Sequence, residues 1–253
     1  MNKKSIVLFV FLIVFCIVLI LNGTLFLIND ISFIDYDTEK EYAFEEYDEE
    51  ELLTALGIRY KMNIFTLSEK KATENFDNNI SLLKLINIER IFPNKVKVTV
   101  LKRYPLYEIN YNDNYYTVDR EGVVINVSKE KTGATSVSGL EIKSITKGQF
   151  MTTENYAASR LTALGQACEL YGYKDAYFTQ IIERIDVNGY TFSLQTRTGV
   201  VIRFNVATNL KQKIREALSW YNSTVAETKR YSGTLTIYDD GQGGYLKPIY
   251  TKA

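Results

Sequence analysis

The stretch IERIFPNKVKVTV, residues 88–100, decides the fold of the first half of this chain. Two segments flank the Pro93-Asn94 turn, Leu85–Phe92 and Lys95–Lys102, and both are long enough to be strands. In the second segment, apolar and polar residues alternate, with valine at 96, 98 and 100. Because side chains along a strand point to opposite faces, this alternation predicts a hairpin with one buried face and one wet face.

Residues upstream of the hairpin supply a strand and two helices. Ile31–Tyr36 is a short apolar stretch that predicts a strand, and the acids of Glu45–Glu51 stand where a helix should begin. That helix is expected to stop at Gly57, and a second one to start at Ser68 or Thr66. The second helix should end near Asn78-Asn79. The predicted unit is therefore β-α-α-β-β, with two helices over a small sheet.

The region after Pro105 predicts a second unit built mainly from hairpins. Asn112-Asp113-Asn114, Asp119–Gly122 and Asn188-Gly189 are typical hairpin turns, and residues 132–139 predict a loop. Apolar residues at helical spacing predict two helices, one with Ala157, Leu161, Leu164, Cys168 and Tyr171 and one with Leu210, Ile214, Ala217, Leu218 and Tyr221. A last strand is expected at Thr234–Tyr238.

The N-terminus predicts a membrane anchor. Ser5–Ile28 is a run of 24 uncharged residues, which as a helix would be about 36 Å long and would cross a bilayer. Lys3 and Lys4 precede the run, so the bias of positive charge predicts a cytoplasmic N-terminus with everything after Asn29 outside. The run lacks a signal-peptide cleavage pattern.

Composition excludes several classes of function. The chain has no histidine, and Cys16 and Cys168 are its two cysteines, so histidine-based triads, zinc sites and a disulfide framework are not expected. Lys+Arg and Asp+Glu both total 30, which gives no basic field for nucleic acid. Residues 35–51 hold ten acids against Lys40, an acidic collar that we interpret as a solvated face. No catalytic residue, metal or cofactor is predicted.

The most suggestive enzymatic pattern is S-x-x-K, the nucleophile motif of penicillin-recognising enzymes. It occurs at four places: Ser68/Lys71, Ser81/Lys84, Ser128/Lys131 and Ser144/Lys147. A K-T-G follows at Lys131-Thr132-Gly133 but overlaps one of these pairs, and no S-D-N lies between them. We therefore interpret the matches as coincidental, with a membrane-anchored cell-wall enzyme that uses Ser128 as the alternative function.

The C-terminal strand predicts a binding site. Thr234–Tyr238 is followed by the glycine-rich segment 239–244, so the strand is expected to present an open edge to which a partner strand can add. Tyr238 and Tyr245 are the expected aromatic anchors. The predicted partner-binding residues are Thr234, Leu235, Thr236, Ile237, Tyr238 and Tyr245. The alternative is an edge covered by Tyr245–Tyr250 of the same chain.

Several segments, in order, resemble the FtsQ/DivIB family of bacterial cell-division proteins. The segments are YKMNIF (60–65), IERIFPNKVKV (88–98), KRYP (102–105), YTVDREGV (116–123), GVVI (199–202), LKQK (210–213) and GTLTI (233–237). The resemblance implies an α+β chain with a POTRA domain followed by a mixed α/β domain dominated by an antiparallel sheet. The expected domains are a cytoplasmic tail (1–4), a transmembrane helix (5–28), a POTRA domain (29–104) with an acidic insertion (35–51), a β domain (105–250) and a tail (251–253).

The resemblance also implies a function. Members of the family are non-enzymatic, single-pass scaffolds of the division septum, and the terminal strand of the β domain binds the coiled-coil proteins FtsB or DivIC, with FtsL beside them. The septal peptidoglycan synthase is a further candidate partner. Thr236 and Tyr238 stand where the family has Asp and Arg. A third hypothesis is an extracytoplasmic sensor that detects wall or lipid fragments through its aromatic surface.

Overall fold

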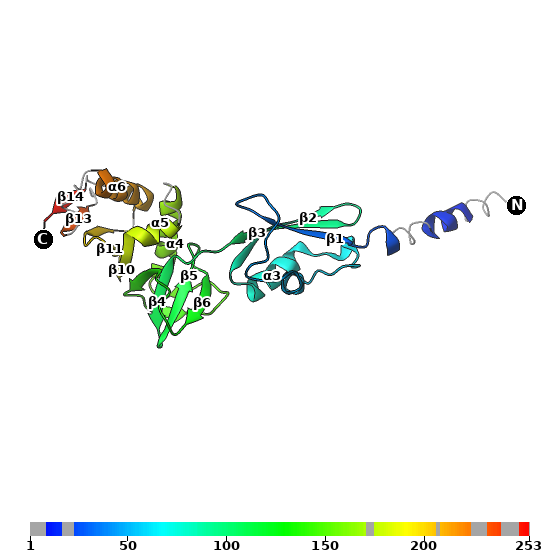
Figure 1. The fold of residues 1–253 in the computed structure, drawn as a ribbon, viewed down its shortest axis with the longest axis horizontal. Helices are drawn as coiled ribbons and strands as arrows, with labels where there is room; N and C mark the ends of the chain where they lie inside the picture. Colours follow the sequence, from blue (N-terminus) through cyan, green and yellow to red (C-terminus); the bar gives the residue numbers. More distant parts are fainter. Residues whose placement is uncertain are drawn as a thin grey trace. The chain divides into compact units, whose positions relative to one another are not determined.

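The computed structural model describes residues 9–16, 23–170, 175–205, 208–223, 232–238 and 248–252. The chain divides into two compact units, Met1–Lys102 and Arg103–Ala253, which are described separately (Figure 1). Within the described ranges, no helix is both long and apolar enough to cross a bilayer. Residues 9–16 are helical, and residues 5–8 and 17–22 of the predicted span lie outside the described residues.

The first unit has the predicted β-α-α-β-β order. Its elements are β1 (Asp30–Asp35), α2 (Glu49–Leu56), the 3₁₀ turn η1 (Ile64–Thr66), α3 (Glu69–Asn79), β2 (Leu83–Ile91) and β3 (Lys95–Lys102). The strands lie in the order β1-β3-β2, with β1 parallel and β2 antiparallel to β3. The hairpin predicted from residues 88–100 is confirmed as the β2–β3 pair.

Local capping explains where the two helices begin and end. The Asp48 carboxylate accepts the Glu51 amide at 2.8 Å, and Glu51 accepts the Asp48 amide at 3.0 Å, which satisfies two free donors at the start of α2. Gly57 ends α2 with φ of 66°, a conformation that costs glycine little. Ser68 caps α3 by accepting the Lys71 amide at 3.4 Å. The predicted acidic helix start, the Gly57 stop and the Ser68 cap are confirmed.

The core of the first unit lies between the sheet and the helices. Val96, Val98 and Val100 are buried as the alternation predicts, and they pack with Leu52 of α2 and Phe76 of α3. Burying each such side chain stabilises the fold by about 1.5 to 3 kcal/mol.

This unit begins inside the predicted membrane run. Ile28 is fully buried in the core, and its amide donates to the Met62 carbonyl at 2.8 Å. Leu27 forms a bridge with Asn63. The last residues of the apolar run are therefore part of the folded domain.

The second unit is built on a nine-stranded sheet of order β14-β13-β12-β11-β10-β7-β4-β5-β6 (Figure 1). The strands are β4 (Tyr107–Tyr111), β5 (Asn114–Val118), β6 (Val124–Ser128), β7 (Thr135–Ser138), β10 (Ile182–Asn188), β11 (Thr191–Thr196), β12 (Val201–Asn205), β13 (Thr234–Ile237) and β14 (Ile249–Thr251). Most neighbours are antiparallel, and the parallel pairs are β4/β7, β7/β10 and β12/β13. Strands β8 (Ile142–Ser144) and β9 (Thr152–Thr153) form a separate ribbon.

Three helices complete this unit: α4 (Ala157–Leu170), α5 (Asp175–Ile181) and α6 (Leu210–Ser223). The two predicted helical stripes are confirmed as α4 and α6, with Leu161, Leu164, Ile214 and Leu218 buried against the sheet. The side chain of Cys168, predicted to be core, lies outside what the structure describes.

The predicted hairpin turns also form. Asn112 and Asp113 both have positive φ, 49° and 57°, between β4 and β5, as a tight two-residue turn requires. Gly189 has φ of 57° between β10 and β11, and Gly122 has φ of 90° in the turn before β6.

The loop predicted at residues 132–139 is wrong, because Thr135–Ser138 forms β7 in the middle of the sheet. Tyr107 of β4 pairs with Thr135, and Arg184 of β10 pairs with Ser136. The Thr135 hydroxyl donates to the Ile182 carbonyl at 2.9 Å. Long-range pairing on both sides therefore overrides a local composition rich in serine and threonine.

Candidate partner-binding surface at the end of the sheet

The C-terminal end of the large sheet holds the predicted partner-binding residues. Strand β13 lies between β12, to which it is parallel, and β14, to which it is antiparallel. Helix α6 packs on β12 and β13, and Figure 1 shows it beside β13. The sheet therefore ends, within the described residues, at β14.

Side chains of β13 alternate between two environments. Leu235 and Ile237 are 0% and 2% exposed and belong to the core. Thr234 and Thr236 are half-buried on the opposite face, and Tyr238, which follows the strand, is 51% exposed. Of the predicted residues in β13 and just after it, Thr234, Thr236 and Tyr238 can offer side chains to a partner, whereas Leu235 and Ile237 stabilise the fold.

The prediction that β13 forms an open edge is wrong. Thr234 pairs with Thr251, Leu235 with Tyr250 and Thr236 with Ile249, so the C-terminal segment of the same chain covers this edge. The alternative that the sequence left open is the one observed, with its strand at Ile249–Thr251. Tyr245 lies outside the described residues.

Within the described residues, β14 is consequently the outermost strand of the sheet. Val201 of β12 donates its amide to the Gly233 carbonyl at 3.0 Å. Because backbone groups alternate in direction along a strand, the N–H and C=O of Leu235 point toward β12, whereas those of Thr234 and Thr236 point toward β14. Thr251 and Ile249 lie opposite these threonines, so they are the residues of β14 whose backbone groups form hydrogen bonds with β13. Between them, Tyr250 directs its N–H and C=O away from β13, toward the outer edge.

The exposed face beside this edge is partly apolar. Ile249 is 51% exposed and lies directly across from Thr236. Tyr238 follows the end of β13, two residues after Thr236, and its side chain is expected on the same face as that of Thr236. The backbone of Tyr250 at the outer side of β14 is thus flanked by the exposed side chains of Ile249 and Tyr238.

The structure fixes β14 closely against β13. The Tyr250 hydroxyl donates to the Ser232 carbonyl. Gly233 has φ of 107°, and a Cβ there would lie 2.6 Å from the Thr251 carbonyl oxygen. Only glycine therefore allows this close approach.

A buried ion pair joins two of the segments on which the family resemblance was based. Arg103 of the KRYP segment contacts the carboxylate of Asp119, from YTVDREGV, and lies 3.1 Å from Glu121. Asp119 also accepts the amides of Glu121 and Val123, at 2.9 and 2.8 Å. Burial raises the pKa of Asp119, although Arg103 and the hydrogen bond from the Val123 amide oppose the shift. The pair therefore holds the start of the second unit to its first hairpins.

The serines of the S-x-x-K matches have structural roles where hydrogen bonds are seen. Ser68 caps α3, and the Ser128 hydroxyl accepts the Glu130 amide at 2.9 Å. Thr132, in the K-T-G match, donates its hydroxyl to the Glu108 carboxylate at 2.9 Å. Ser81 is buried and donates its amide to the Tyr47 hydroxyl at 3.2 Å.

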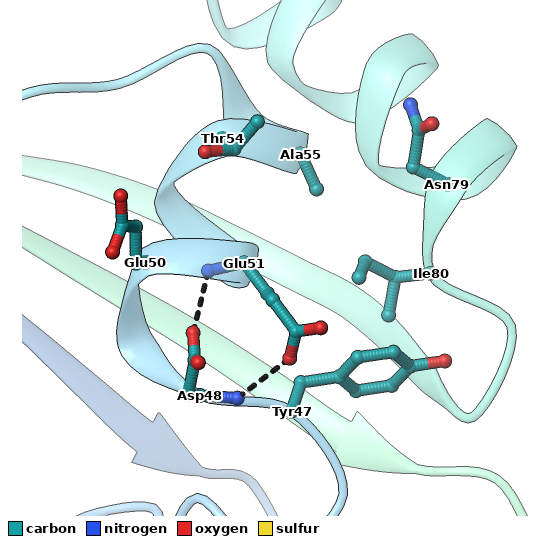
Figure 2. A pocket seen from close by; sticks show the side chains of 8 residues that line it. All are labelled: Tyr47, Asp48, Glu50, Glu51, Thr54, Ala55, Asn79 and Ile80. Atoms are coloured by element: carbon teal, nitrogen blue, oxygen red, sulfur yellow. Dashed lines mark hydrogen bonds between the residues drawn. The ribbon is translucent and has the colours of Figure 1, made fainter.

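A hollow of about 400 Å³ lies between α2 and α3 in the first unit. Figure 2 shows Asp48 and Glu51 joined by the two capping hydrogen bonds on its wall. Tyr47, which also lines it, accepts amides from Ser81 and Leu82. These groups form hydrogen bonds that cap α2 and hold the segment before β2. We therefore interpret the hollow as a feature of the packing and not as a binding site.

A second hollow, of about 350 Å³, lies in the second unit and was not predicted from the sequence. Its wall includes Met151 and Thr162, and two aromatic side chains stand at its rim: Phe150 is 64% exposed and Tyr156 is 75% exposed. A single phenylalanine in the polar segment 148–155 was the one available signal.

Comparisons with known proteins identify the first unit. Residues 44–103 match the model of the FtsQ-type POTRA domain. The chain is 30% identical over 71 residues to cell division protein DivIB of Clostridium acetobutylicum, a match that covers 28% of each chain. The chain therefore aligns with less than a third of the length of this relative.

One solved structure is the major extracytoplasmic domain of the trans isomer of DivIB from Geobacillus stearothermophilus. The similarity covers 47% of this chain and 92% of that one, with 8% identity and a TM-score of 0.31. At that TM-score the likeness adds nothing to the assignment.

The fold and the match over residues 44–103 define a protein with an FtsQ-type POTRA domain. The second unit follows it as a sheet-dominated mixed α/β domain. The resemblance found in the sequence is confirmed over the first unit, where the chain matches the FtsQ-type POTRA domain and is similar to a cell division protein DivIB.

Proposed function

We propose that this chain is a non-enzymatic scaffold of the bacterial division septum, anchored by one membrane span with its two folded units outside. The match to the FtsQ-type POTRA domain and the similarity to a cell division protein DivIB support a role in division. The uncharged residues 5–24, which precede the part of the run that is hydrogen-bonded within the first unit, support the anchor. The POTRA domain would make further septal contacts, with the peptidoglycan synthase among the candidates.

The binding mode we propose is strand addition at β14, with an FtsB/DivIC-type protein as the partner and an FtsL-type protein beside it. The observation that carries this proposal is that β14 is the outermost strand of the sheet within the described residues, with the exposed side chains of Ile249 and Tyr238 on the adjoining face. Main-chain hydrogen bonds would supply affinity, and the side chains on the adjoining face would supply specificity. Thr234, Thr236 and Tyr238, from the original set of residues, remain in the proposed site together with Ile249.

Leu235 and Ile237 enter this proposal only indirectly. Both are buried under α6 and keep β13 in place, so their substitution would disturb the fold before it tested binding. The proposed site therefore replaces the open β13 edge with the edge that the chain's own last strand provides.

The experiment uses the full chain in nanodiscs and the FtsB/DivIC-type protein of the same organism. Tyr238→Lys places a charge on the proposed contact face and should weaken binding by at least about tenfold. Tyr156→Lys is the matched control, since Tyr156 is an exposed tyrosine of the same unit at a different surface. Equal binding by the Tyr238→Lys variant and the unsubstituted chain would contradict the proposed site.

A second measurement tests the absence of enzymatic activity. The alternative of a penicillin-recognising enzyme requires a serine that attacks a β-lactam. We expect the full chain to remain unlabelled by fluorescent penicillin. Labelling that disappears in Ser128→Ala would contradict the scaffold proposal.

A further inference from the structure

Three phenylalanine rings form an aromatic cluster on the first unit. The rings of Phe26 and Phe65 are 4.9 Å apart between centroids, and those of Phe65 and Phe92 are 5.4 Å apart. Phe65 and Phe92 are each 55% exposed. Exposed apolar rings gathered in this way mark a contact surface more often than rings scattered singly.

The chain enters the folded unit through this cluster. The Phe26 carbonyl accepts the Ile64 amide at 2.9 Å, and the Ile28 carbonyl accepts the Lys61 amide at 2.7 Å. Both residues also belong to the uncharged run of residues 5–28. No linker therefore separates the predicted membrane run from the fold, because its last residues are hydrogen-bonded within the domain.

This continuity determines what lies nearest to the cluster. A run that leaves the bilayer near Leu25 places the next residue, Phe26, within about one residue length, 3.3 to 3.8 Å, of the point of exit. Phe65 contacts that ring directly. The cluster must then lie at the level of the lipid headgroups, where aromatic side chains are favoured.

We propose that Phe26, Phe65 and Phe92 dock the POTRA domain onto the outer surface of the lipid bilayer that holds its anchor. This inference rests on the membrane anchor of the proposed function. It adds that side chains of the POTRA domain itself hold this domain against the membrane. The orientation of the domain relative to the bilayer would therefore be set at the end of the anchor.

Charges near the cluster suit a lipid surface. Asp30, which follows the apolar run most closely, is paired with Lys95 at 2.7 Å, so its negative charge is balanced. Arg59 and Lys61 are exposed on the turn that bonds to Ile28. Long basic side chains can reach phosphate groups while their stems lie on apolar surface.

The test places a tryptophan in the cluster and measures its distance from lipid. The chain has one tryptophan, Trp220, so Trp220→Phe gives a silent background for the full-length protein. Phe65→Trp in this background is reconstituted into phosphatidylethanolamine/phosphatidylglycerol vesicles that contain lipids with brominated acyl chains. Phe92→Trp serves as an independent second probe.

Tyr36→Trp in the same background is the matched control. Tyr36 is also 55% exposed, but it follows the far end of β1, about 20 Å from Asp30 at 3.3 Å per residue. We expect bromolipid to quench the tryptophan at 65 or 92 at least twice as strongly as the tryptophan at 36. Equal quenching of the probes and the control would overturn the proposal.

Other outcomes separate the causes of failure. Protein that does not float with the vesicles would overturn both the anchor and the docking. Protein that floats, with its tryptophan at 65 shielded from acrylamide but not quenched by bromolipid, would indicate a protein partner or a second copy and would overturn the docking alone. Binding of the FtsB/DivIC-type protein, measured in the same vesicles, reports on the scaffold function independently.

Discussion

The hydroxyl of Tyr250 donates a hydrogen bond to the carbonyl of Ser232, the residue that stands two positions before β13. A side chain of β14 is thereby hydrogen-bonded to the segment that leads into β13, the strand with which β14 pairs. Together with the close approach at Gly233, this contact holds β14 against β13.

Removal of that hydroxyl should loosen β14 without displacing it. Tyr250→Phe loses one hydrogen bond, worth about 1 kcal/mol, but it keeps the ring that packs beside the core. We expect faster amide exchange at residues 249–251 and unchanged exchange in β10 and β11, measured by hydrogen–deuterium exchange. Unchanged exchange at residues 249–251 would show that the hydroxyl does not hold the strand.

Gly233→Ala should displace β14. Its Cβ would meet the Thr251 carbonyl oxygen at 2.6 Å, and φ of 107° is strained for alanine. We expect a loss of about 1 to 3 kcal/mol in the free energy of unfolding and weaker partner binding. Gly189→Ala is the control, because φ is positive there but no atom lies within 4 Å of the added carbon. Equal effects of both variants on binding would argue against β14 as the site.

The Arg103–Asp119 pair should be important for stability. Their side chains are 10% and 5% exposed, so Arg103→Met leaves the Asp119 carboxylate buried without its cation. We expect a loss of about 3 to 5 kcal/mol, measured by urea unfolding.

A surface ion pair provides the control for that experiment. Lys70→Met removes the partner of Glu74 in a pair whose side chains are 87% and 60% exposed, and it should change stability by less than about 1 kcal/mol. Similar losses of stability in Arg103→Met and Lys70→Met would show that the buried pair contributes no more to stability than the exposed pair does.

Glu46 should make the first unit sensitive to acid. Burial alone would raise its pKa, but hydrogen bonds from Lys102 and Tyr42 outweigh this effect and lower the pKa below its usual 4.5. The stability that this carboxylate contributes is therefore present above pH 4.5 and is lost as the pH falls through the lowered value. Glu46→Gln should lower the free energy of unfolding by about 1 kcal/mol at pH 7. Below pH 4.5, the stability of this variant should fall less steeply with pH than that of the unsubstituted chain.

Urea unfolding from pH 3 to pH 7 measures this dependence. Glu50→Gln is the control, since Glu50 is an acid of the same segment for which no such pair is seen in the described contacts. A pH profile of Glu46→Gln that coincides with the profile of the unsubstituted chain would contradict this assignment.

Local signals made much of the fold predictable. The valines at 96, 98 and 100 alternate because only one face of β3 meets the helices, and Ser68 and Gly57 mark helix ends through their own backbone chemistry. Asn112 and Asp113 tolerate the positive φ of a hairpin. Each of these features depends on residues close together in the sequence.

The features that could not be predicted depend on distant contacts. Strand β7 has four residues, and its strand state comes from pairing with β4 and β10. Strand β14 has three residues, preceded by a proline that cannot donate a hydrogen bond. The pairing of β14 with β13 determines which of the two is the outer strand in the described part of the sheet. The candidate residues could therefore be named from the sequence, whereas the outer strand could not.

The central claim is that a partner strand adds to β14, the outermost strand of the sheet within the described residues. Tyr250→Pro removes the backbone N–H that Tyr250 directs away from β13, and Tyr250→Ala removes the same side chain but keeps the N–H. The decisive measurement is the dissociation constant of each full-length variant in nanodiscs for the FtsB/DivIC-type partner, by isothermal titration calorimetry. We predict that the proline variant binds about tenfold more weakly than the alanine variant. Equal affinities of the two variants would contradict strand addition at this edge.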